Sequence, residues 1–190
     1  MRQLTSTELK RLHRERRRST QGDLALILHR VLSPLNVGSI CRSAAALRAT
    51  RVWCCAGTPA AGNAPTQRTG RGSSKYLDAK LVEDTADAVA EAKRLGYLVV
   101  ALELADTSLP LHEVDLPATV CFLVGNEDQG LSPAVLAQAD AAAYVPLLGR
   151  IGSLNVAASV SIALYEARRQ QWSRTNAPTP GSTGGGERSS

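Results

Sequence analysis

The sequence predicts an α/β domain built around a parallel sheet, and two observations lead to this fold class. Short apolar runs rich in β-formers alternate with helix-like segments along most of the 190 residues. The composition, 44% hydrophobic and 21% charged, allows a sizeable core. The longest apolar runs, such as residues 97–102, are far shorter than the roughly 18 residues needed to span a bilayer, so we expect no membrane segment. One domain with a short appendage fits this length.

The first half of the chain predicts a basic helix followed by strand and helix units. Thr5 or Ser6 can cap the first helix, and Ser33-Pro34 breaks the chain between the first strand and the next helix. In order, we expect a helix over 5–19, a strand over 24–31, a helix over 36–49 and a strand over 51–55. The segment 57–74 is rich in Gly, Pro, Thr and Arg and is predicted to be a loop.

The second half of the chain continues the alternation. Gly96 ends one amphipathic helix, and Ser132-Pro133 begins another with a cap and a first-turn proline. We expect strands over 80–83, 97–104, 119–124 and 142–145, a helix over 85–95, a loop over 147–154 and a long helix over 155–172. The tail from Ser173 is rich in Thr, Pro, Gly and Ser, which predicts disorder.

The net charge of +5 lies entirely in the first 18 residues. They hold seven of the 22 cations and two of the 17 anions, so residues 19–190 carry 15 charges of each sign. Five cations share one face of the predicted first helix through their 3–4 spacing: Lys10, Arg11, Arg14, Arg17 and Arg18. This asymmetry predicts either an arm that binds a polyanion or a solvated basic tail.

Cysteine and histidine usage gives no sign of a metal site or of disulfides. Cys54 and Cys55 are neighbours, Cys41 and Cys121 stand alone, and none of them forms a C-x-x-C pair. The N-terminus has cations but no apolar region of a secretory signal. We therefore predict free buried thiols, a cytoplasmic location and no metal.

Three polar or glycine-containing segments follow predicted strands. They cover residues 36–42, 123–131 and 145–156, and ligands of parallel sheets bind beyond the carboxyl ends of the strands. Each segment alone has a structural interpretation, namely strand-to-helix turns, helix caps at Asn36 and Asn155, and an ion pair of Arg42 with Glu127 or another acid. Neither a G-x-G-x-x-G pattern nor a phosphate-binding loop is present.

Taken together, in this order and spacing, the three segments resemble the three motifs of the SpoU (TrmH) family of RNA ribose 2'-O-methyltransferases, in the SPOUT superfamily. Residues 36–42 fit N-x-G-x-I-x-R, residues 123–131 read LVGNEDQGL, and residues 146–156 fit P-x-x-G-x-x-x-S-L-N-V. The resemblance covers residues 24–171. It implies a Rossmann-like SPOUT domain of the α/β class with a C-terminal deep trefoil knot.

The resemblance also implies S-adenosyl-L-methionine as cofactor, held mainly by backbone groups between apolar walls. The residues that it assigns to cofactor binding are Leu102, Glu103, Gly125, Asn126, Val145, Leu147, Leu154 and Ala157. It further implies a homodimer with the active site at the interface. Apolar residues of the long helix would be divided between the core and a two-fold patch: Val160, Ala163, Leu164 and Ala167.

The catalytic residues implied by the resemblance are Arg42, Asn36, Glu127, Ser153 and Asn155. A guanidinium holds its proton strongly and is a poor base, so we expect Arg42 to bind the adjacent phosphate and stabilise the developing alkoxide. Asn36 would orient ribose or phosphate, and Glu127 would hold Arg42 or Asn36 in position. Ser153 and Asn155 would line the pocket where cofactor and ribose meet.

The short basic arm and the end of the last helix are similar to the enzymes that methylate a D-loop guanosine of tRNA. Leu35 and Gln171 depart from those enzymes, which tend to carry His and Arg there. We therefore favour tRNA as partner over ribosomal RNA, and a non-catalytic RNA-binding member is the third alternative. The residues expected to contact RNA are Lys10, Arg11, Arg14, Arg17, Arg18, Arg71, Lys75 and Arg169. The expected organisation is an RNA-binding arm over 1–22, a methyltransferase domain over 23–172 and a disordered tail over 173–190.

Overall fold

A seven-stranded parallel sheet forms the centre of the computed structural model, which describes residues 1–175. The strand order is β3-β2-β1-β6-β4-β7-β5, and every pairing is parallel. The strands are β1 Asp23–His29, β2 Arg51–Cys55, β3 Asp78–Val82, β4 Leu98–Leu102, β5 Leu109–Pro110, β6 Thr119–Val124 and β7 Ala141–Tyr144. The predicted α/β fold with a parallel sheet is confirmed.

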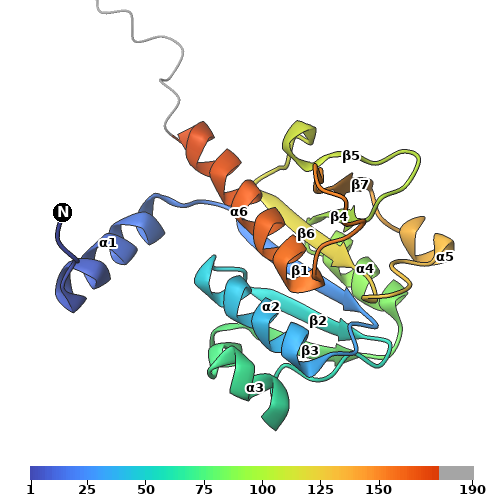
Figure 1. The fold of residues 1–190 in the computed structure, drawn as a ribbon, viewed down its shortest axis with the longest axis horizontal. Helices are drawn as coiled ribbons and strands as arrows, with labels where there is room; N and C mark the ends of the chain where they lie inside the picture. The colour runs from blue at the N-terminus through green and yellow to red at the C-terminus, as the bar shows by residue number, and fades with distance from the viewer. Residues whose placement is uncertain (176–190) are drawn as a thin grey trace, which may run out of the picture.

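Helices cover both faces of the sheet (Figure 1). The helices of the described residues are α1 Ser6–Ser19, α2 Pro34–Ala46, α3 Ala64–Gly70, α4 Thr85–Arg94, α5 Pro133–Leu136 and α6 Val156–Thr175, with short 3₁₀ turns at η1 Ser73–Tyr76 and η2 Leu111–Glu113; α1 does not cover the sheet. Helices α2 and α6 pack on one face, whereas α4 and α5 pack on the other. Because side chains alternate along β1, Leu26 enters the first core and Ile27 the second.

The second helix begins where its sequence provides both a cap and a first-turn proline. Ser33 is the N-cap of α2, its side chain accepts a hydrogen bond from the backbone N–H of Asn36, and Pro34 occupies the first turn. The helix therefore begins two residues earlier than we predicted. The consequence for the site is that Asn36 lies within the first turn of α2 and does not cap it.

Two other sequence predictions need correction, and one strand was not predicted. The segment 57–74 is not a continuous loop, because Asn63 caps α3 and Pro65 lies in its first turn. Helix α6 continues to Thr175, so the predicted disorder is wrong for residues 173–175, and residues 176–190 lie outside the described part of the chain. The strand β5 has only two residues, and no sequence pattern predicted it. These are short elements or helix ends, which tertiary packing decides.

The apolar side of α6 lies in the core of this chain. The side chains that we divided between core and dimer patch are all buried: Val160, Ala163, Leu164 and Ala167. That division is therefore wrong, because none of these side chains is free to form a patch. The large apolar side chains exposed on α6 are those of Ile162 and Tyr165 instead.

Helix α1 contributes no buried residue and projects away from the sheet (Figure 1). A capping box of Thr5 and Glu8 begins it, so Thr5 is the one of the two predicted caps that the helix uses. Within residues 1–175 no helix is both long and apolar enough to cross a membrane.

Candidate functional site

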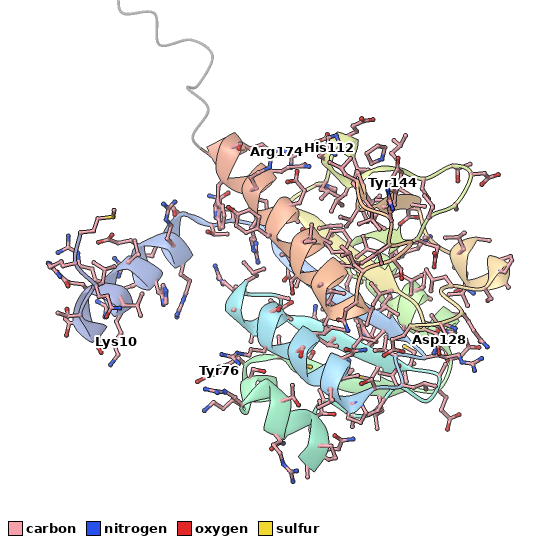
Figure 2. The ribbon with its side chains drawn as sticks, viewed as in Figure 1. Lys10, Tyr76, His112, Asp128, Tyr144 and Arg174 are labelled. Atoms are coloured by element: carbon pink, nitrogen blue, oxygen red, sulfur yellow. The ribbon has the colours of Figure 1, made fainter. Side chains whose placement is uncertain are left out.

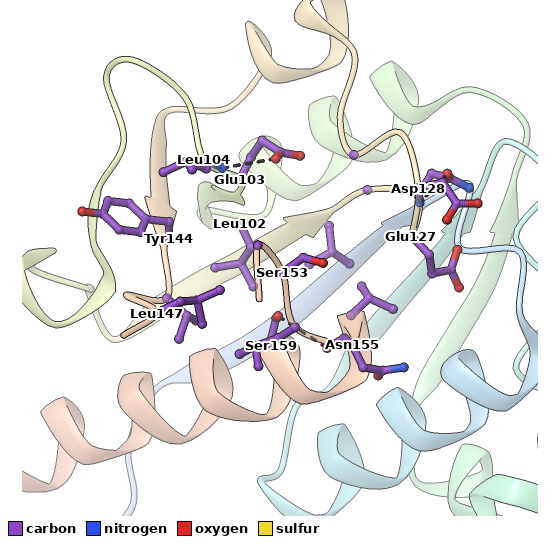
Figure 3. Close-up of a pocket in the computed structure, with 18 of the residues that line it drawn as sticks. Leu102, Glu103, Leu104, Glu127, Asp128, Tyr144, Leu147, Ser153, Asn155 and Ser159 are labelled. Atoms are coloured by element: carbon purple, nitrogen blue, oxygen red, sulfur yellow. Dashed lines mark hydrogen bonds between the residues drawn. The ribbon is translucent and has the colours of Figure 1, made fainter. Parts of the chain in front are cut away.

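A pocket lies beyond the carboxyl ends of β4, β6 and β7, and all three motif segments contribute to it. It encloses about 890 Å³. Figure 3 shows Leu102, Leu147 and Ser153 around its centre, with Glu127 and Asp128 to one side. Because the strands are parallel, their carboxyl ends meet at one edge, and segments distant in sequence converge there.

A chain of hydrogen bonds links the three motif segments. The Nδ2 of Asn36 donates to Oε1 of Glu127 over 2.8 Å, and the Nδ2 of Asn155 donates to Oδ1 of Asn36 over 2.9 Å. The Oδ1 of Asn155 accepts the backbone N–H of Ala157 over 2.9 Å, so Asn155 also caps α6. The structural interpretation of Asn155 as a cap is therefore correct, and the same amide reaches the site.

Glu127 is held as a carboxylate by its neighbours. Burial alone would raise its pKa, but hydrogen bonds from Asn36 and from the backbone N–H groups of Leu32 and Ser33 outweigh burial and hold the pKa below its usual value. The ionised carboxylate thus joins the start of α2 to the turn after β6. Glu127 contacts Asn36 and not Arg42.

The turn after β6 has a backbone that only small residues allow. Gly130 has a φ of 63°, and a Cβ placed there would lie 2.4 Å from the carboxylate of Glu103. That carboxylate accepts the backbone N–H of Leu131 over 2.8 Å. Asn126 closes the same turn by accepting the N–H groups of Asp128 and Gln129. Glu103 and Asn126 therefore shape the pocket wall through the backbone of this turn.

Arg42 is exposed on α2 and forms no hydrogen bond or ion pair with the residues that the structure describes. It is not among the residues that line the pocket. The ion pair with Glu127 that we considered is absent, because Glu127 is occupied by Asn36 and the start of α2. The unpaired guanidinium of Arg42 lies about one and a half helical turns beyond Asn36. It is available to an external anion, which its planar donors can bind with two parallel hydrogen bonds.

Most of the predicted cofactor residues line this pocket. They are Leu102, Glu103, Gly125, Asn126, Val145, Leu147 and Leu154, joined by the predicted catalytic residues Asn36, Glu127, Ser153 and Asn155. Ala157 is buried in the core behind the pocket, and its N–H is occupied by Asn155. The roles assigned to all these residues stay predictions.

The predicted RNA-contacting residues lie in separate places. Figure 2 shows Lys10 on α1 at the opposite end of the molecule from the pocket residues Asp128 and Tyr144. Arg71 and Lys75 belong to the α3–η1 segment, which packs against α2. Arg169 forms a two-point ion pair with Glu166 on α6. No cation lines the pocket.

Sequence reasoning missed several pocket residues. Leu104, Tyr144 and Ser159 line the pocket without belonging to a motif, and their strand-end or helix-start positions were the only signal. Arg30 was also missed: it is exposed beside the pocket turn, where its carbonyl accepts Asn126 Nδ2 over 2.9 Å. It has a left-handed φ of 54°, which sequence patterns do not reveal for an arginine.

No group of three or more His, Cys, Asp or Glu side chains that could hold a metal ion occurs among residues 1–175. The four cysteines are free and buried. Burial raises the pKa of the thiols of Cys41 and Cys55 to about 12, which makes them poor nucleophiles.

Comparison with known proteins adds independent evidence on this arrangement. The model of the family described as the SpoU rRNA Methylase family matches residues 23–165, which include all three motif segments. The chain belongs to this family. The resemblance drawn from the motifs is therefore confirmed.

SpoU-family relatives cover most of the chain. The tRNA (guanosine(18)-2'-O)-methyltransferase of Escherichia coli is 32% identical over 80% of this chain and 65% of its own length. The protein of the same name from Thermus thermophilus is 32% identical over 90% of this chain and 87% of its own. An AdoMet-bound rRNA methyltransferase from Sinorhizobium meliloti superposes with a TM-score of 0.73 at 33% identity, over 80% of this chain and 57% of that one. The chain therefore spans less than two thirds of the E. coli and Sinorhizobium proteins.

Proposed function

We propose that this chain transfers a methyl group from S-adenosyl-L-methionine to the 2'-hydroxyl of a ribose in RNA. The observation that carries the proposal is the hydrogen-bonded chain Glu127–Asn36–Asn155, which joins the three family motifs at the edge of one pocket. Support comes from relatives named as RNA 2'-O-methyltransferases and from a similar structure named as AdoMet-bound.

The pocket fits this cofactor in size, walls and charge. Its volume of about 890 Å³ lies within the usual range for ligand sites. Leu102, Leu147 and Leu154 offer apolar walls. The lining also contains Glu103, Glu127 and Asp128 but no Lys, Arg or His, which suits a ligand with a sulfonium and an ammonium. When bound, the cofactor supplies an electrophilic methyl group.

The residues of this chain would orient the acceptor and balance its charge. Arg42 would bind an RNA phosphate and stabilise negative charge that develops on the ribose oxygen. Asn36 would hold the ribose, because Glu127 and Asn155 fix its amide from both sides. The gain is one of positioning, since in-line transfer requires both reactants to be held in a reactive geometry.

We also propose that the segment 145–155 is part of a deep trefoil knot. It leads from β7 to α6 and lines the pocket beside the turn after β6, as expected if the C-terminal segment passes through an earlier loop. Such threading is rare and rests here on membership of the family.

A homodimer is the assembly that we propose. Large apolar side chains are exposed on α6, on the loop before it and at the start of α2: Leu35, Leu148, Ile151, Ile162 and Tyr165. Helices α2 and α6 contact each other, and a second copy packed against these two helices would cover such side chains. Leu148 is fully exposed in the single chain and belongs to a pocket-bordering loop, so a second copy would also complete the site.

For the substrate we favour tRNA. The tRNA methyltransferase of Thermus thermophilus matches 90% of this chain and 87% of its own length. Ribosomal RNA is the second candidate, because a similar structure is named as an rRNA methyltransferase. The arm over residues 1–22 would bind the phosphates, and the free buried cysteines support a reducing, cytoplasmic location.

The test is to incubate the protein with labelled S-adenosylmethionine and total RNA, and then map the modified nucleotide. We expect label in a ribose 2'-O-methyl group of tRNA, and none with Arg42→Ala. Label confined to ribosomal RNA would replace the substrate but keep the reaction. RNA binding without cofactor binding by calorimetry would show a non-catalytic member and overturn the proposal.

A further inference from the structure

Arg48 occupies a backbone position that favours glycine. It follows α2 with a φ of 58°, and two hydrogen bonds close the helix end: Arg48 N–H to Ala45 O over 3.2 Å and Ala49 N–H to Ala44 O over 2.8 Å. This pattern is a Schellman motif with Arg48 at the left-handed position. A side chain there strains the backbone, so its presence directs attention to what the guanidinium contacts.

The guanidinium of Arg48 caps helix α1. Its Nη1 donates to the carbonyl of Arg17 over 3.1 Å and to that of Thr20 over 3.3 Å. These carbonyls lie at the C-terminal end of α1, where helical partners are missing and a cation opposes the negative end of the helix dipole. Helix α1 therefore receives its C-terminal cap from the residue that follows α2.

A second contact holds the same end of α1. The Nε1 of Trp172 donates to Oγ1 of Thr20 over 2.8 Å, and that hydroxyl donates to the carbonyl of Arg16 over 2.7 Å. The indole of Trp172 packs edge-to-face against Tyr165, with ring centroids 6.0 Å apart. The last turn of α1 is thus fixed to α6 as well as to the end of α2.

The backbone that presents Arg48 is itself held by a buried residue. Arg168 is 1% exposed, and its guanidinium donates to the carbonyls of Arg48 over 2.7 Å and of Leu47 over 2.8 Å. We call Thr20, Arg48, Arg168 and Trp172 the arm anchor. It joins α1 to a rigid part of the molecule at one end only, because α1 buries no side chain.

Helix α2 connects the arm anchor to the pocket. Asn36 lies in its first turn, Arg42 follows, and Arg48 stands two residues beyond its last residue. Its 13 residues span about 20 Å at about 1.5 Å each. Figure 1 shows α2 running from the side where β1 ends toward the side on which α1 projects. The basic arm and the pocket are therefore held at the two ends of one helix.

We propose that Arg48 is a positioning residue, which holds the basic face of α1 in a fixed orientation so that RNA bound by the arm presents its target ribose at the pocket. This inference rests on the proposed function. A fixed arm raises the effective concentration of the bound RNA at the site, whereas a swinging arm would bind the same phosphates without that advantage.

The variant that tests it is Arg48→Gly, because glycine accepts the left-handed backbone and only the guanidinium is lost. Arg48→Lys is the matched control, since it keeps a cation and the same backbone demand but lacks the forked guanidinium. A dye on Ser6→Cys reports the motion of α1 through fluorescence anisotropy decay. The native cysteines are buried, so the introduced thiol is labelled selectively.

We expect Arg48→Gly to keep or raise the melting temperature and to enlarge the fast component of the anisotropy decay. The KM for RNA should rise about tenfold while kcat at saturating RNA changes less than about twofold, because binding geometry and not the reactive groups is altered. For Arg48→Lys, the fast component of the anisotropy decay and the KM for RNA should lie between the values of Arg48→Gly and of the parent. The KM effect should vanish in a full-length chain whose five arm cations are replaced by Gln.

An unchanged anisotropy decay in Arg48→Gly would overturn the proposal, as would a KM effect that persists with the neutralised arm. A failure of this proposal can be distinguished from a failure of the proposed function. If the parent protein methylates no RNA, the proposed function fails. In that case the anisotropy decay and the RNA affinity of Arg48→Gly still test the positioning role of Arg48. A larger motion of α1 together with weaker RNA binding would support that role.

Discussion

The amide of Asn155 donates a hydrogen bond over 2.9 Å to the amide oxygen of Asn36, 119 positions earlier in the sequence. The same two side chains contact the carboxylate of Glu127 at one end and the first turn of α6 at the other. The orientation of the Asn36 amide is thereby determined, with its nitrogen toward Glu127 and its oxygen toward Asn155. The geometry of the site therefore depends on Glu127, Asn36 and Asn155 together.

Replacing Asn155 should therefore reduce both stability and activity. Asn155→Ala removes the cap of α6, which costs about 1 kcal/mol, and leaves the oxygen of Asn36 without its donor. Asn155→Ser is the control, because its hydroxyl can still cap the helix but is too short to reach Asn36. We expect Ser to restore the free energy of unfolding, measured in urea, but not kcat. Full activity in Asn155→Ser would show that the contact with Asn36 is dispensable.

Arg42→Ala should abolish methyl transfer and leave the fold intact. Because Arg42 is exposed and forms no hydrogen bond or ion pair within residues 1–175, the free energy of unfolding should change by less than about 0.5 kcal/mol. The affinity for S-adenosylmethionine, measured by calorimetry, should be nearly unchanged, because the residue does not line the pocket. Methylation at the parental rate would exclude Arg42 from the reaction.

Gly130→Ala should damage the pocket wall. The φ of 63° disfavours a side chain, and its Cβ would lie 2.4 Å from the carboxylate of Glu103. We expect a loss of about 1–3 kcal/mol in stability together with weaker cofactor binding. Gly149→Ala is the matched control in the same lining, because a Cβ there meets nothing closer than 4.0 Å. Equal melting temperatures of the two variants would contradict the proposal that the turn at Gly130 shapes the pocket wall.

The stability of the protein should depend on Glu127 at acid pH. Its pKa is lower in the folded chain than its ordinary value of 4.5, since the hydrogen bonds from Asn36, Leu32 and Ser33 outweigh burial. The stabilisation is then fully present above pH 4.5 and is lost as the pH falls through the folded pKa. The free energy of unfolding of Glu127→Gln should thus fall less steeply than that of the parent below about pH 4.5. Parallel pH profiles would count against this pKa shift.

Removing the arm charges should flatten the salt dependence of RNA binding. Replacing Lys10, Arg11, Arg14, Arg17 and Arg18 by Gln leaves fewer phosphates neutralised, so the slope of log affinity against log salt should decrease by up to about 4. Arg94→Gln, on the exposed surface of α4, is the control and should leave the slope within about 1 of the parent. An unchanged slope in the five-residue variant would identify the arm as a solvated tail.

The sequence by itself determined the fold class, the order of the principal strands and helices and the family. Local signals were sufficient there. Short continuous apolar runs mark β1 and β6, Ser33-Pro34 marks the start of α2, and the three motifs can be recognised from their spacing without any knowledge of contacts. Only the tertiary structure decided which partner each motif residue has. Glu127 contacts Asn36 and leaves Arg42 unpaired, and Arg48 reaches across to α1. Such choices depend on which groups parallel strand ends and packed helices bring within about 3 Å of each other, a distance that no sequence spacing encodes.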